Sequence, residues 1–434
     1  MDIEKGGQEV KMNSKIVVIF VILVIIVIGV TIVKIQLNKN ESEINKQNQE
    51  IKDQAQEGHI NLAEYSDNDF PIEFLKIENK GKNIIYSPLS IKYALKMLEE
   101  GAGGNTKEQI LKVIGNANTT KYNNIDNVMS LANAMYIKKD YSSNIKEIYK
   151  NILNKRYNAE INYDEFKNAD NINKWIENKT LGKIKDMLED EMVKSANMIL
   201  VNALAIDMEW NEKFDEEKTY GQEFYLENGE IMIATTMHQK VSSDNFSYYK
   251  DNDVTLLRMD LKEYNDTQLD FNIIIPSGNL SEYVQKFNMN EFYTIMDKAK
   301  LASETSYGLE ISVPRFKYEY DLKLKQDLQE LGITDAFNAN KADFTKISDE
   351  KFYASDALHK ANIELSEKGT KAGAATVIIM KATAALVLNE PEKIKIDKPF
   401  LYVIRDKKTG EIWFVGTVYE PNLWENDKAD YERK

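Results

Sequence analysis

Three short motifs carry side chains with which serine enzymes transfer acyl groups. Ser143 and Lys146 have the spacing of a serine nucleophile and its lysine partner in the pattern S-x-x-K. Residues 243–245 read SDN and residues 408–410 read KTG, in the chain order that this chemistry uses. In such a site the serine hydroxyl attacks a carbonyl carbon after a neighbouring base has taken its proton. An acyl-transfer enzyme is therefore the first hypothesis to weigh.

The surroundings of these motifs argue against that enzyme. Ser143 lies in the polar stretch YSSN and not on an apolar helix face, and Ser243 lies in the polar run SSDNFS. The KTG sequence lies in DKKTGE between two apolar strand-like runs, where a hairpin turn accounts for it. A membrane-anchored, penicillin-recognising serine enzyme is kept only as a remote alternative.

The composition narrows the chemistry further. The 434-residue chain has no cysteine, which excludes disulfides, a thiol nucleophile and a thiolate metal site. Its three histidines, His59, His238 and His359, are too few and too scattered for a zinc signature. The net charge of −14, from 70 acidic and 56 basic residues, argues against a nucleic-acid-binding surface. We therefore expect no metal, no other cofactor and no nucleic acid.

Residues 364–376, ELSEKGTKAGAAT, have a composition suited to movement. Before them, residues 359–366 alternate apolar Ala361, Ile363 and Leu365 with polar side chains, which is typical of a strand with one buried face. Continued past Gly369, the alternation collects mostly small side chains on one face: Thr370, Ala372, Ala374, Thr376, Ile378, Met380 and Ala382. Such a strand can slide between two others, because inward bulk or charge would block it. From composition alone, a surface linker or a helix stays equally open.

The sequence EKGTKAGAAT resembles the proximal hinge of the serpins, serine-protease inhibitors with a mobile reactive loop. The likeness recurs in the family's order at residues 83–110, 173–184, 201–210, 343–348, 358–370 and 398–422. The second of these is similar to the helix across the family's main sheet, and the third to its central strand. The resemblance covers about residues 62–422, and no single motif carries it.

The expected fold class is α+β (mixed). Helical periodicity dominates residues 72–188, and strand periodicity dominates residues 201–236, 256–275 and 394–418. The resemblance implies a serpin fold with a large central, mainly antiparallel sheet, two smaller sheets, about eight to nine helices and an exposed mobile reactive loop.

The N-terminal region predicts a membrane anchor. Residues 16–33, IVVIFVILVIIVIGVTIV, form an 18-residue run without charge, which is long enough to span a bilayer as a helix. The end of this run and the residues just after it, VTIVKIQ (30–36), lack a small-residue cleavage site, so an uncleaved anchor at residues 16–35 is favoured over a cleaved signal peptide. Lysines before and after the run barely discriminate its orientation.

The expected organisation follows from the anchor and the resemblance. Residues 1–15 form a short cytoplasmic N-terminus, because an anchored inhibitor is most useful facing proteases at the cell surface or in the periplasm. A secreted, released form is the alternative. The other expected segments are a polar tether at 36–60, a serpin domain at 61–424 with its reactive loop at about 367–395, and a charged tail at 425–434.

The resemblance implies a hydrogen-bonded cluster under the centre of the main sheet, made by Ser87, Ser90, Asn202 and His359. In the family this cluster governs whether two strands can part. Removing one buried member would leave the others unpaired at about 1 to 3 kcal/mol. Ser87 also suits the N-cap of a helix that begins at Pro88, and helix capping alone would explain it.

The resemblance also places the moving parts. Trp210 matches the tryptophan at the top of the sheet, where the loop begins to insert, although Met208 stands where the family usually has glycine. Gly369 can pivot because glycine adopts positive φ freely. The matched hinge residues are Glu367, Gly369, Thr370, Ala372, Gly373, Ala374, Ala375 and Thr376.

By the family's spacing, the scissile bond joins Thr383 to Ala384, between small side chains that elastase-like or subtilisin-like proteases accept. A shifted register at Lys381–Ala382 would suit trypsin-like proteases, and a cysteine protease stays open as a target. The implied function is that of a monomeric suicide-substrate inhibitor and not an enzyme: the cleaved loop inserts into the main sheet and traps the acylated protease. A non-inhibitory serpin-fold binding module is the alternative.

Overall fold

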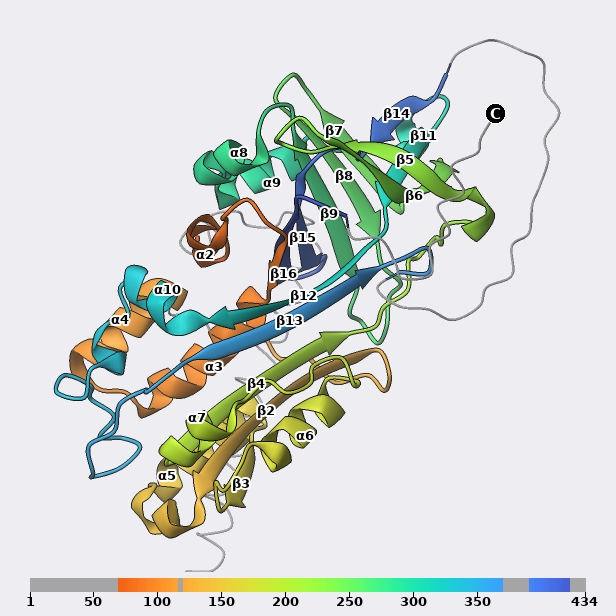
Figure 1. Cartoon of the computed structure of the whole chain (residues 1–434). Helices are drawn as coiled ribbons and strands as arrows, with labels where there is room; N and C mark the ends of the chain where they lie inside the picture. The colour runs from red at the N-terminus through yellow and green to blue at the C-terminus, as the bar shows by residue number, and fades with distance from the viewer. Residues whose placement is uncertain (1–68, 116–119, 370–389, 422–434) are drawn as a thin grey trace, which may run out of the picture. The chain divides into compact units, whose positions relative to one another are not determined.

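The computed structural model describes residues 69–115, 120–369 and 390–421, all within the unit that runs from Tyr65 to Lys434. Within these residues the chain forms nine α-helices and sixteen strands, arranged in four sheets (Figure 1). The helices are α2 (Phe70–Glu78), α3 (Pro88–Gly101), α4 (Gly104–Ile114), α5 (Glu147–Tyr157), α6 (Asp170–Lys179), α7 (Asp190–Ser195), α8 (Leu280–Lys286), α9 (Met289–Asp297) and α10 (Leu324–Glu330).

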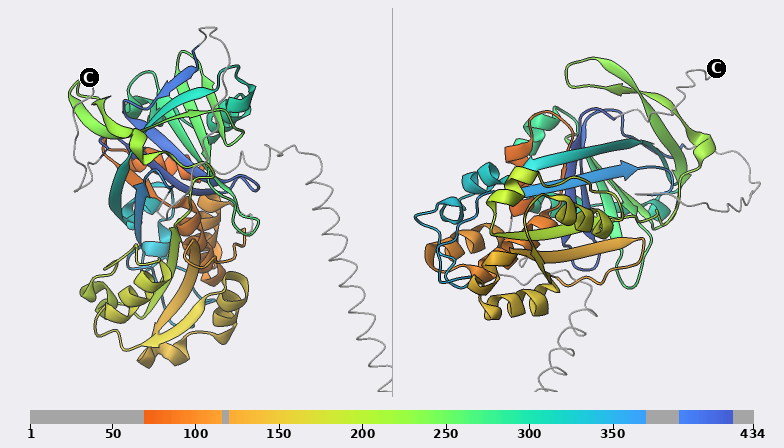
Figure 2. Two further views of the ribbon diagram at one scale, coloured as in Figure 1. Left: turned by 90° about the vertical axis from the view of Figure 1, so that its right-hand side faces the viewer. Right: turned by 60° about the horizontal axis from the view of Figure 1, so that its bottom comes forward.

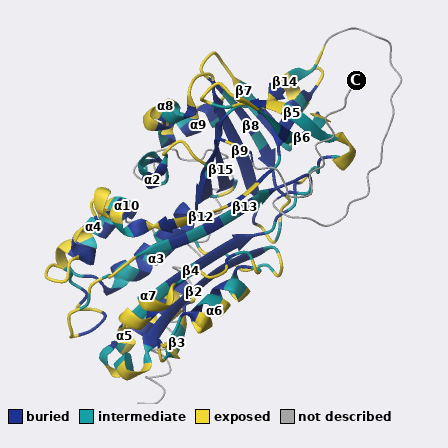
Figure 3. Ribbon diagram, viewed as in Figure 1, coloured by how far each residue is buried: buried dark blue, intermediate teal, exposed yellow. Residues whose placement is uncertain are grey.

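The largest sheet has seven strands, and every neighbouring pair is antiparallel. Its strands β9, β15 and β16 are buried at every residue, in keeping with their mostly apolar sequences, and the buried Asp270 of β9 pairs with Arg405 of β15 at 3.1 Å (Figure 3). The strand order is β1 (Ile84–Tyr86), β16 (Ile412–Val418), β15 (Phe400–Asp406), β9 (Leu269–Pro276), β8 (Val254–Asp260), β7 (Phe246–Lys250) and β10 (Lys300–Leu301). We call it the closed sheet.

A four-stranded sheet contains β14, which ends where the reactive loop was expected to end, at residue 395. Its order is β14 (Glu392–Lys395), β11 (Leu309–Pro314), β6 (Ile231–Val241) and β5 (Thr219–Tyr225). The pair β14–β11 is parallel, and the other two pairs are antiparallel.

The remaining strands form two partial sheets. One contains β12 (Phe316–Lys323) and β13 (Leu358–Leu365), and the other contains β3 (Glu160–Asp164), β2 (Met129–Lys138) and β4 (Met198–Ile206). Strands β4 and β13 run in the same direction side by side (Figures 1 and 2). No ladder of hydrogen bonds joins β4 to β13 in the part of the chain that the structure describes. We call these strands together the divided sheet.

The predicted mixed fold class is confirmed, and so is the strand before the hinge. In β13, His359, Ala361, Ile363 and Leu365 are buried and alternate with half-exposed residues. The expected large antiparallel sheet is present as the closed sheet. The segment likened to the family's central strand, residues 201–210, contains the second half of β4, and the strand expected before the hinge is β13; the two strands lie side by side in the divided sheet. Their facing edges do not pair with each other among the described residues, and cavities lie between them.

Helices cover both faces of the half that contains β2 and β4. The start of α3 is fixed as predicted, since the Ser87 hydroxyl accepts from the Ser90 N–H at 3.0 Å and Pro88 stands at the first helical position. On the other face, α6 buries Ile172 and Ile176 against Tyr136 and Val201. Among the described residues, no helix has the length and apolar character to cross a membrane, and the anchor predicted at residues 16–35 lies outside them.

Candidate strand-acceptor site in the divided sheet

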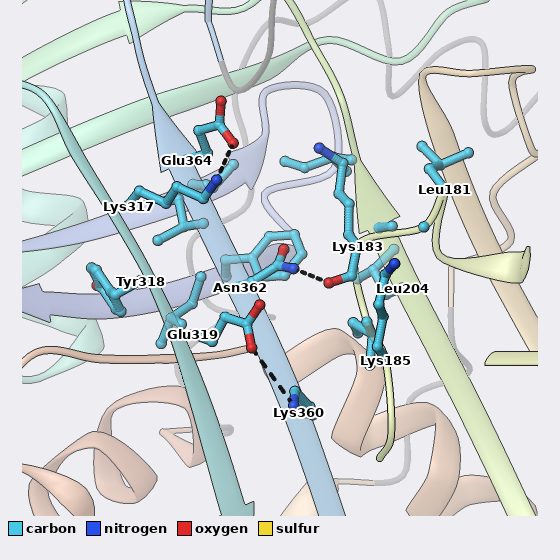
Figure 4. Close-up of a pocket in the computed structure, with 18 of the residues that line it drawn as sticks. Leu181, Lys183, Lys185, Leu204, Lys317, Tyr318, Glu319, Lys360, Asn362 and Glu364 are labelled. Atoms are coloured by element: carbon cyan, nitrogen blue, oxygen red, sulfur yellow. Dashed lines mark hydrogen bonds and ion pairs between the residues drawn. The ribbon is translucent and has the colours of Figure 1, made fainter. Parts of the chain in front are cut away.

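The gap between β4 and β13 holds a cavity of about 460 Å³ (Figure 4). Its floor comes from the closed sheet, through Ile85, Ile404 and Phe414, and its walls include Leu204 of β4 and Ile363 of β13. Residues 181–186, which connect α6 to α7 and which we call the strap, line the cavity opposite that floor. The cavity is therefore a slot between two strands with a floor and a roof.

A second cavity of about 310 Å³ lies further along the same gap, beside the beginnings of β4 and β13. It is lined by residues 198–202 of β4 and by Leu358 and His359 of β13. The helices and loops around it contribute mainly apolar side chains, including Leu95, Ile176, Leu324, Phe337 and Phe344. An extended chain that entered the gap would meet apolar surroundings on its inward face.

The structure brings together the four predicted cluster residues. The Ser87 N–H donates to Nε2 of His359 at 3.0 Å, and the Ser90 hydroxyl donates to Oδ1 of Asn202. These bonds join α3 to β13 on one side of the gap and to β4 on the other. The cluster thus contacts both strands that face the gap.

Burial keeps His359 neutral in this cluster. Desolvation lowers the pKa of His359 from 6.5 to about 4, because the fully buried ring loses the water that would solvate its charged form. The bond from Ser87 agrees with this state, since Nε2 can accept only when it carries no proton. His359 therefore acts as a hydrogen-bond acceptor near neutral pH.

The sequence reasoning missed a fifth member of the cluster. Nδ2 of Asn202 donates to Oδ1 of Asn133 at 2.7 Å, and Nδ2 of Asn133 donates to the Tyr157 carbonyl at 2.8 Å. Asn133 lies on β2 directly opposite Asn202. An asparagine within the apolar run MSLANAMYIK was the available signal, because a buried amide needs hydrogen-bond partners.

Trp210 fastens the hinge to the end of β4. Its indole N–H donates to the Ser366 carbonyl at 2.8 Å, and its backbone N–H donates to the Lys368 carbonyl at 3.0 Å. Glu367 is held by an ion pair with Arg315 at 3.3 Å, and its carbonyl accepts from the Phe214 N–H at 2.9 Å. The turn that leaves β13 is thus tightly held.

Gly369 lies between the extensions of both strands. It forms antiparallel bridges with Ser366, just after β13, and with Glu209, just after β4. Its φ is +128°, and a Cβ atom there would lie 2.4 Å from the Met208 carbonyl oxygen. Only glycine fits this position. Met208, the departure from the family pattern, is itself buried and leaves these bridges in place.

The other predicted loop residues lie outside the described part of the chain. These are the hinge residues Thr370, Ala372, Gly373, Ala374, Ala375 and Thr376, the bond Thr383–Ala384 and the alternative bond Lys381–Ala382.

The three serine-enzyme motifs lie on separate elements with other partners. The exposed Ser143 hydroxyl, in a 3₁₀ turn (Lys139–Asn144), donates to Asn144, whereas Lys146 bonds the Thr345 carbonyl. Ser243 donates to Glu212 at 2.7 Å. Residues 408–410 form the predicted turn between β15 and β16. No hydrogen bond among the described residues joins one motif to another, so they form no shared site there.

Comparison with known proteins points to one family. The family model "Serpin (serine protease inhibitor)" matches residues 66–421. An "Uncharacterized serpin-like protein" of Methanosarcina acetivorans is 30% identical over 374 residues, which cover 80% of this chain and 83% of the relative. The "Leukocyte elastase inhibitor" of Xenopus laevis is 29% identical, over 79% of this chain and 94% of the relative.

A solved structure shares the fold. The crystal structure of tengpin, described as a thermophilic serpin in the native state, is 28% identical to the chain and has a TM-score of 0.70. The match covers 84% of this chain and 95% of tengpin.

Proposed function

The chain belongs to the serpin family, and on that premise we propose that it is a suicide-substrate inhibitor of serine proteases whose cleaved loop inserts between β4 and β13. Members of the family are generally inhibitors that act on target proteases. The observation that carries the proposal is Gly369, which bridges to the extensions of both strands, next to a gap that holds a cavity among the described residues.

The register of an inserted strand follows from that bridge. If the antiparallel pairing of Ser366 with Gly369 continues down β13, Thr370 faces Leu365 and Thr376 faces His359. Direct partners in an antiparallel pair project to the same side, so the small residues at 370, 372, 374 and 376 would share the buried face of β13. Insertion would also give hydrogen-bond partners to the facing edges of β4 and β13.

The proposed reaction begins as ordinary proteolysis. The protease serine attacks the Thr383 carbonyl, the bond to Ala384 breaks, and the new amino group leaves with a proton, which produces an acyl-enzyme ester. Residues 370–383 number fourteen, which in strand conformation reach about 46 Å at roughly 3.3 Å per residue. That length exceeds the nine residues of β4, so insertion would carry the attached protease along the whole gap before water hydrolyses the ester.

The proposed target is a subtilisin-like or elastase-like protease, because small side chains flank Thr383. The similarity to the leukocyte elastase inhibitor of Xenopus laevis supports this class. A trypsin-like protease acting at Lys381 is the alternative within the same mechanism. We further propose that residues 16–35 anchor the chain in a membrane and hold a monomeric inhibitor domain on the extracytoplasmic side.

The test is incubation of the full chain, purified in mild detergent, with subtilisin, elastase and trypsin. A complex that survives denaturing electrophoresis, together with a released peptide that begins at Ala384 by mass spectrometry, is the expected result. A peptide that begins at Ala382 would move the target to trypsin-like proteases. Cleavage at either bond without a complex would contradict trapping of these proteases.

The variant Thr370→Arg distinguishes the proposed inhibitor from a non-inhibitory binding module with the same fold. The arginine would face the buried side of the gap, so insertion should stall and the variant should be cleaved as a substrate. Lys371→Arg is the matched control, because position 371 falls on the opposite face and should keep its inhibition. A Thr370→Arg variant that inhibits as well as the parent would show that loop insertion is not the mechanism.

A further inference from the structure

Six asparagines of the chain begin the pattern Asn-x-Ser/Thr, in which x is not proline. This pattern is the acceptor sequence for N-linked oligosaccharides on proteins outside the cytoplasm. Because it occurs six times, the pattern alone selects no site. Two of the asparagines, Asn40 and Asn118, lie outside the described residues, and the surroundings of the other four can be compared: Asn178, Asn245, Asn265 and Asn279.

Two of the four described patterns run into buried elements. Asn178 lies near the end of α6, and Thr180 of its pattern is fully buried. The pattern of Asn245 continues into β7, where Phe246 and Ser247 are 2% and 1% exposed. An enzyme could reach either pattern only after part of a helix or a strand had unfolded.

A third pattern is fixed at the start of α8. The Asn279 side chain caps this helix by accepting from the Glu282 N–H at 3.1 Å. Leu280 is buried, and the Ser281 hydroxyl donates to Glu227 at 3.2 Å. The side chains of this pattern are therefore already engaged in the fold.

The fourth pattern lies in a turn between β8 and β9. Asn265 and Asp266 are exposed and have φ values of +46° and +66°. The backbones of Tyr264 and Thr267 close the turn with two hydrogen bonds of 2.9 Å, each residue donating to the other. Asparagine tolerates positive φ, so the turn alone would explain Asn265 but not the threonine two residues later.

The turn can open without disturbing the closed sheet. Thr267 is only 9% exposed while the turn is closed. The two bonds that close it lie beyond the last residues joined in the ladder of β8 and β9, which are Asp260 and Asp270. Breaking them would expose the whole pattern at a small local cost.

The exposed Glu263 distinguishes this pattern further, because it stands two positions before Asn265. A carboxylate there offers an enzyme a charged contact in addition to the amide and the hydroxyl. In the other five patterns the corresponding residue is not acidic: Asn38, Asn116, Ile176, Ser243 and Ser277.

We propose that Asn265 is an acceptor for an N-linked oligosaccharide. This inference rests on the proposed extracytoplasmic placement of the domain and is independent of protease trapping. The donor is an oligosaccharide joined through a diphosphate to a polyprenyl lipid, and a membrane oligosaccharyltransferase performs the transfer. Nδ2 of Asn265 attacks C1 of the first sugar, the bond from C1 to the phosphate oxygen breaks, and the lipid diphosphate leaves. The amide gives one proton to a base of the transferase.

The test expresses the full chain in bacterial cells that carry this donor and a single-subunit transferase acting outside the cytoplasm, of the class that recognises Asp/Glu-x-Asn-x-Ser/Thr. Mass spectrometry of the intact chain and of its peptides should find one oligosaccharide, on the peptide that contains Asn265. Asn265→Gln and Thr267→Val should each abolish the added mass. Thr267→Ser keeps a hydroxyl and should retain it.

Ser277→Glu is the matched control. It gives Asn279 an acidic residue at the same spacing but leaves that pattern fixed at the start of α8. The variant should gain no second oligosaccharide. Equal modification of Asn279 and Asn265 would overturn the selection of Asn265 by its turn.

A parallel reaction of the purified, folded chain in mild detergent, with the same donor and transferase, separates two failures. Modification in detergent but not in cells would keep Asn265 as an acceptor and overturn the extracytoplasmic placement. An unmodified chain in both reactions would overturn Asn265 as an acceptor. Protease trapping is measured separately by the gel assay, so neither failure is confused with a failure of the inhibitor.

Discussion

The closed sheet and the divided sheet differ in how completely their strands are paired. In the closed sheet every strand from β16 to β7 has a hydrogen-bonded neighbour on each side, and β9, β15 and β16 are buried throughout. In the divided sheet, the edges of β4 and β13 that face the gap pair with no other strand among the residues that the structure describes, and the gap contains two cavities. Unpaired edges of this kind usually invite pairing with another strand. Here the two edges lie inside the fold, and the proposed function pairs them with the segment that follows Gly369 in the sequence.

The two halves of the divided sheet are not equally free to move. The buried Tyr318 hydroxyl of β12 lies within 2.8–3.1 Å of the Tyr402 hydroxyl and of the carbonyl oxygens of Ile84 and Thr417, all in the closed sheet. Burial raises the pKa of Tyr318 well above its usual range, so the phenol keeps its proton. The half with β12 and β13 is therefore fastened to the closed sheet. Opening of the gap should displace mainly β4 with its layer of α6.

The largest effect should come from breaking the closed sheet. Ile273 of β9 is fully buried, and Ile273→Ala should lower the free energy of unfolding by about 2–5 kcal/mol through lost burial and the cavity left behind. Because the proposed insertion adds a strand to the divided sheet and not to the closed sheet, the loss should be the same for the uncleaved and the loop-cleaved protein. Urea unfolding of both forms measures it. A loss confined to one form would mean that the closed sheet also rearranges on cleavage.

The next largest effect is expected in the divided sheet, at the buried cluster beside the gap. Asn202→Ala leaves Ser90 and Asn133 without their partner, which should cost the uncleaved protein about 1–3 kcal/mol in the free energy of unfolding. Urea unfolding measures this loss. A second measurement is the rate at which the uncleaved chain takes up a synthetic peptide that copies residues 370–381, and this rate should rise. Asn252→Ala, in the exposed turn before β8, is the control and should change neither. A stable Asn202→Ala protein with unchanged uptake would remove the cluster from the control of opening.

Local sequence rules predicted the parts of the molecule that depend on near neighbours. The alternation around Ala361 gave the β13 strand, Ser87 gave the helix cap, and the KTG sequence gave a turn between two strands. The four cluster residues were found only through the resemblance, because the bond from Ser87 to His359 joins positions 272 residues apart.

The gap, and the contacts of Lys183 with Asn362 and Asp207 at its two sides, could not be predicted from the sequence in the same way. Lys183 looks like a solvated lysine in a polar loop, and its contact with Asn362 spans 179 residues. The division of the sheet likewise depends on how far apart two buried strands settle, which neither hydrophobic periodicity nor turn chemistry encodes.

A lower pH should reduce the free energy of unfolding through His359, which lies in the divided sheet. Its pKa is about 4 in the folded state against 6.5 for the ordinary group, so the unfolded chain takes up the proton first as the pH falls. Stability from this residue is fully present above pH 6.5 and is lost progressively down to about pH 4, at a slope near 1.4 kcal/mol per pH unit. Between pH 6 and 5 the expected loss is about 1 kcal/mol.

The measurement that isolates this term is the difference in urea stability between the parent and His359→Gln at several pH values. Glutamine can still accept from the Ser87 N–H but does not titrate, so the variant should lack the extra slope. Parallel pH profiles for the two proteins would contradict a neutral, buried His359.

The smallest effect on stability is expected at Ser143. This residue lies outside both sheets, so its variant is a reference for the changes made within them. Its hydroxyl is exposed and bonds only the neighbouring Asn144 among the described contacts, so Ser143→Ala should change the free energy of unfolding by less than about 0.5 kcal/mol. Protease trapping should also be intact, because the proposed mechanism depends on the gap and the loop and not on this serine. The gel assay for covalent complexes decides the matter: loss of inhibition in Ser143→Ala would revive the serine-enzyme hypothesis, whereas an intact inhibitor leaves the divided sheet as the working part of the molecule.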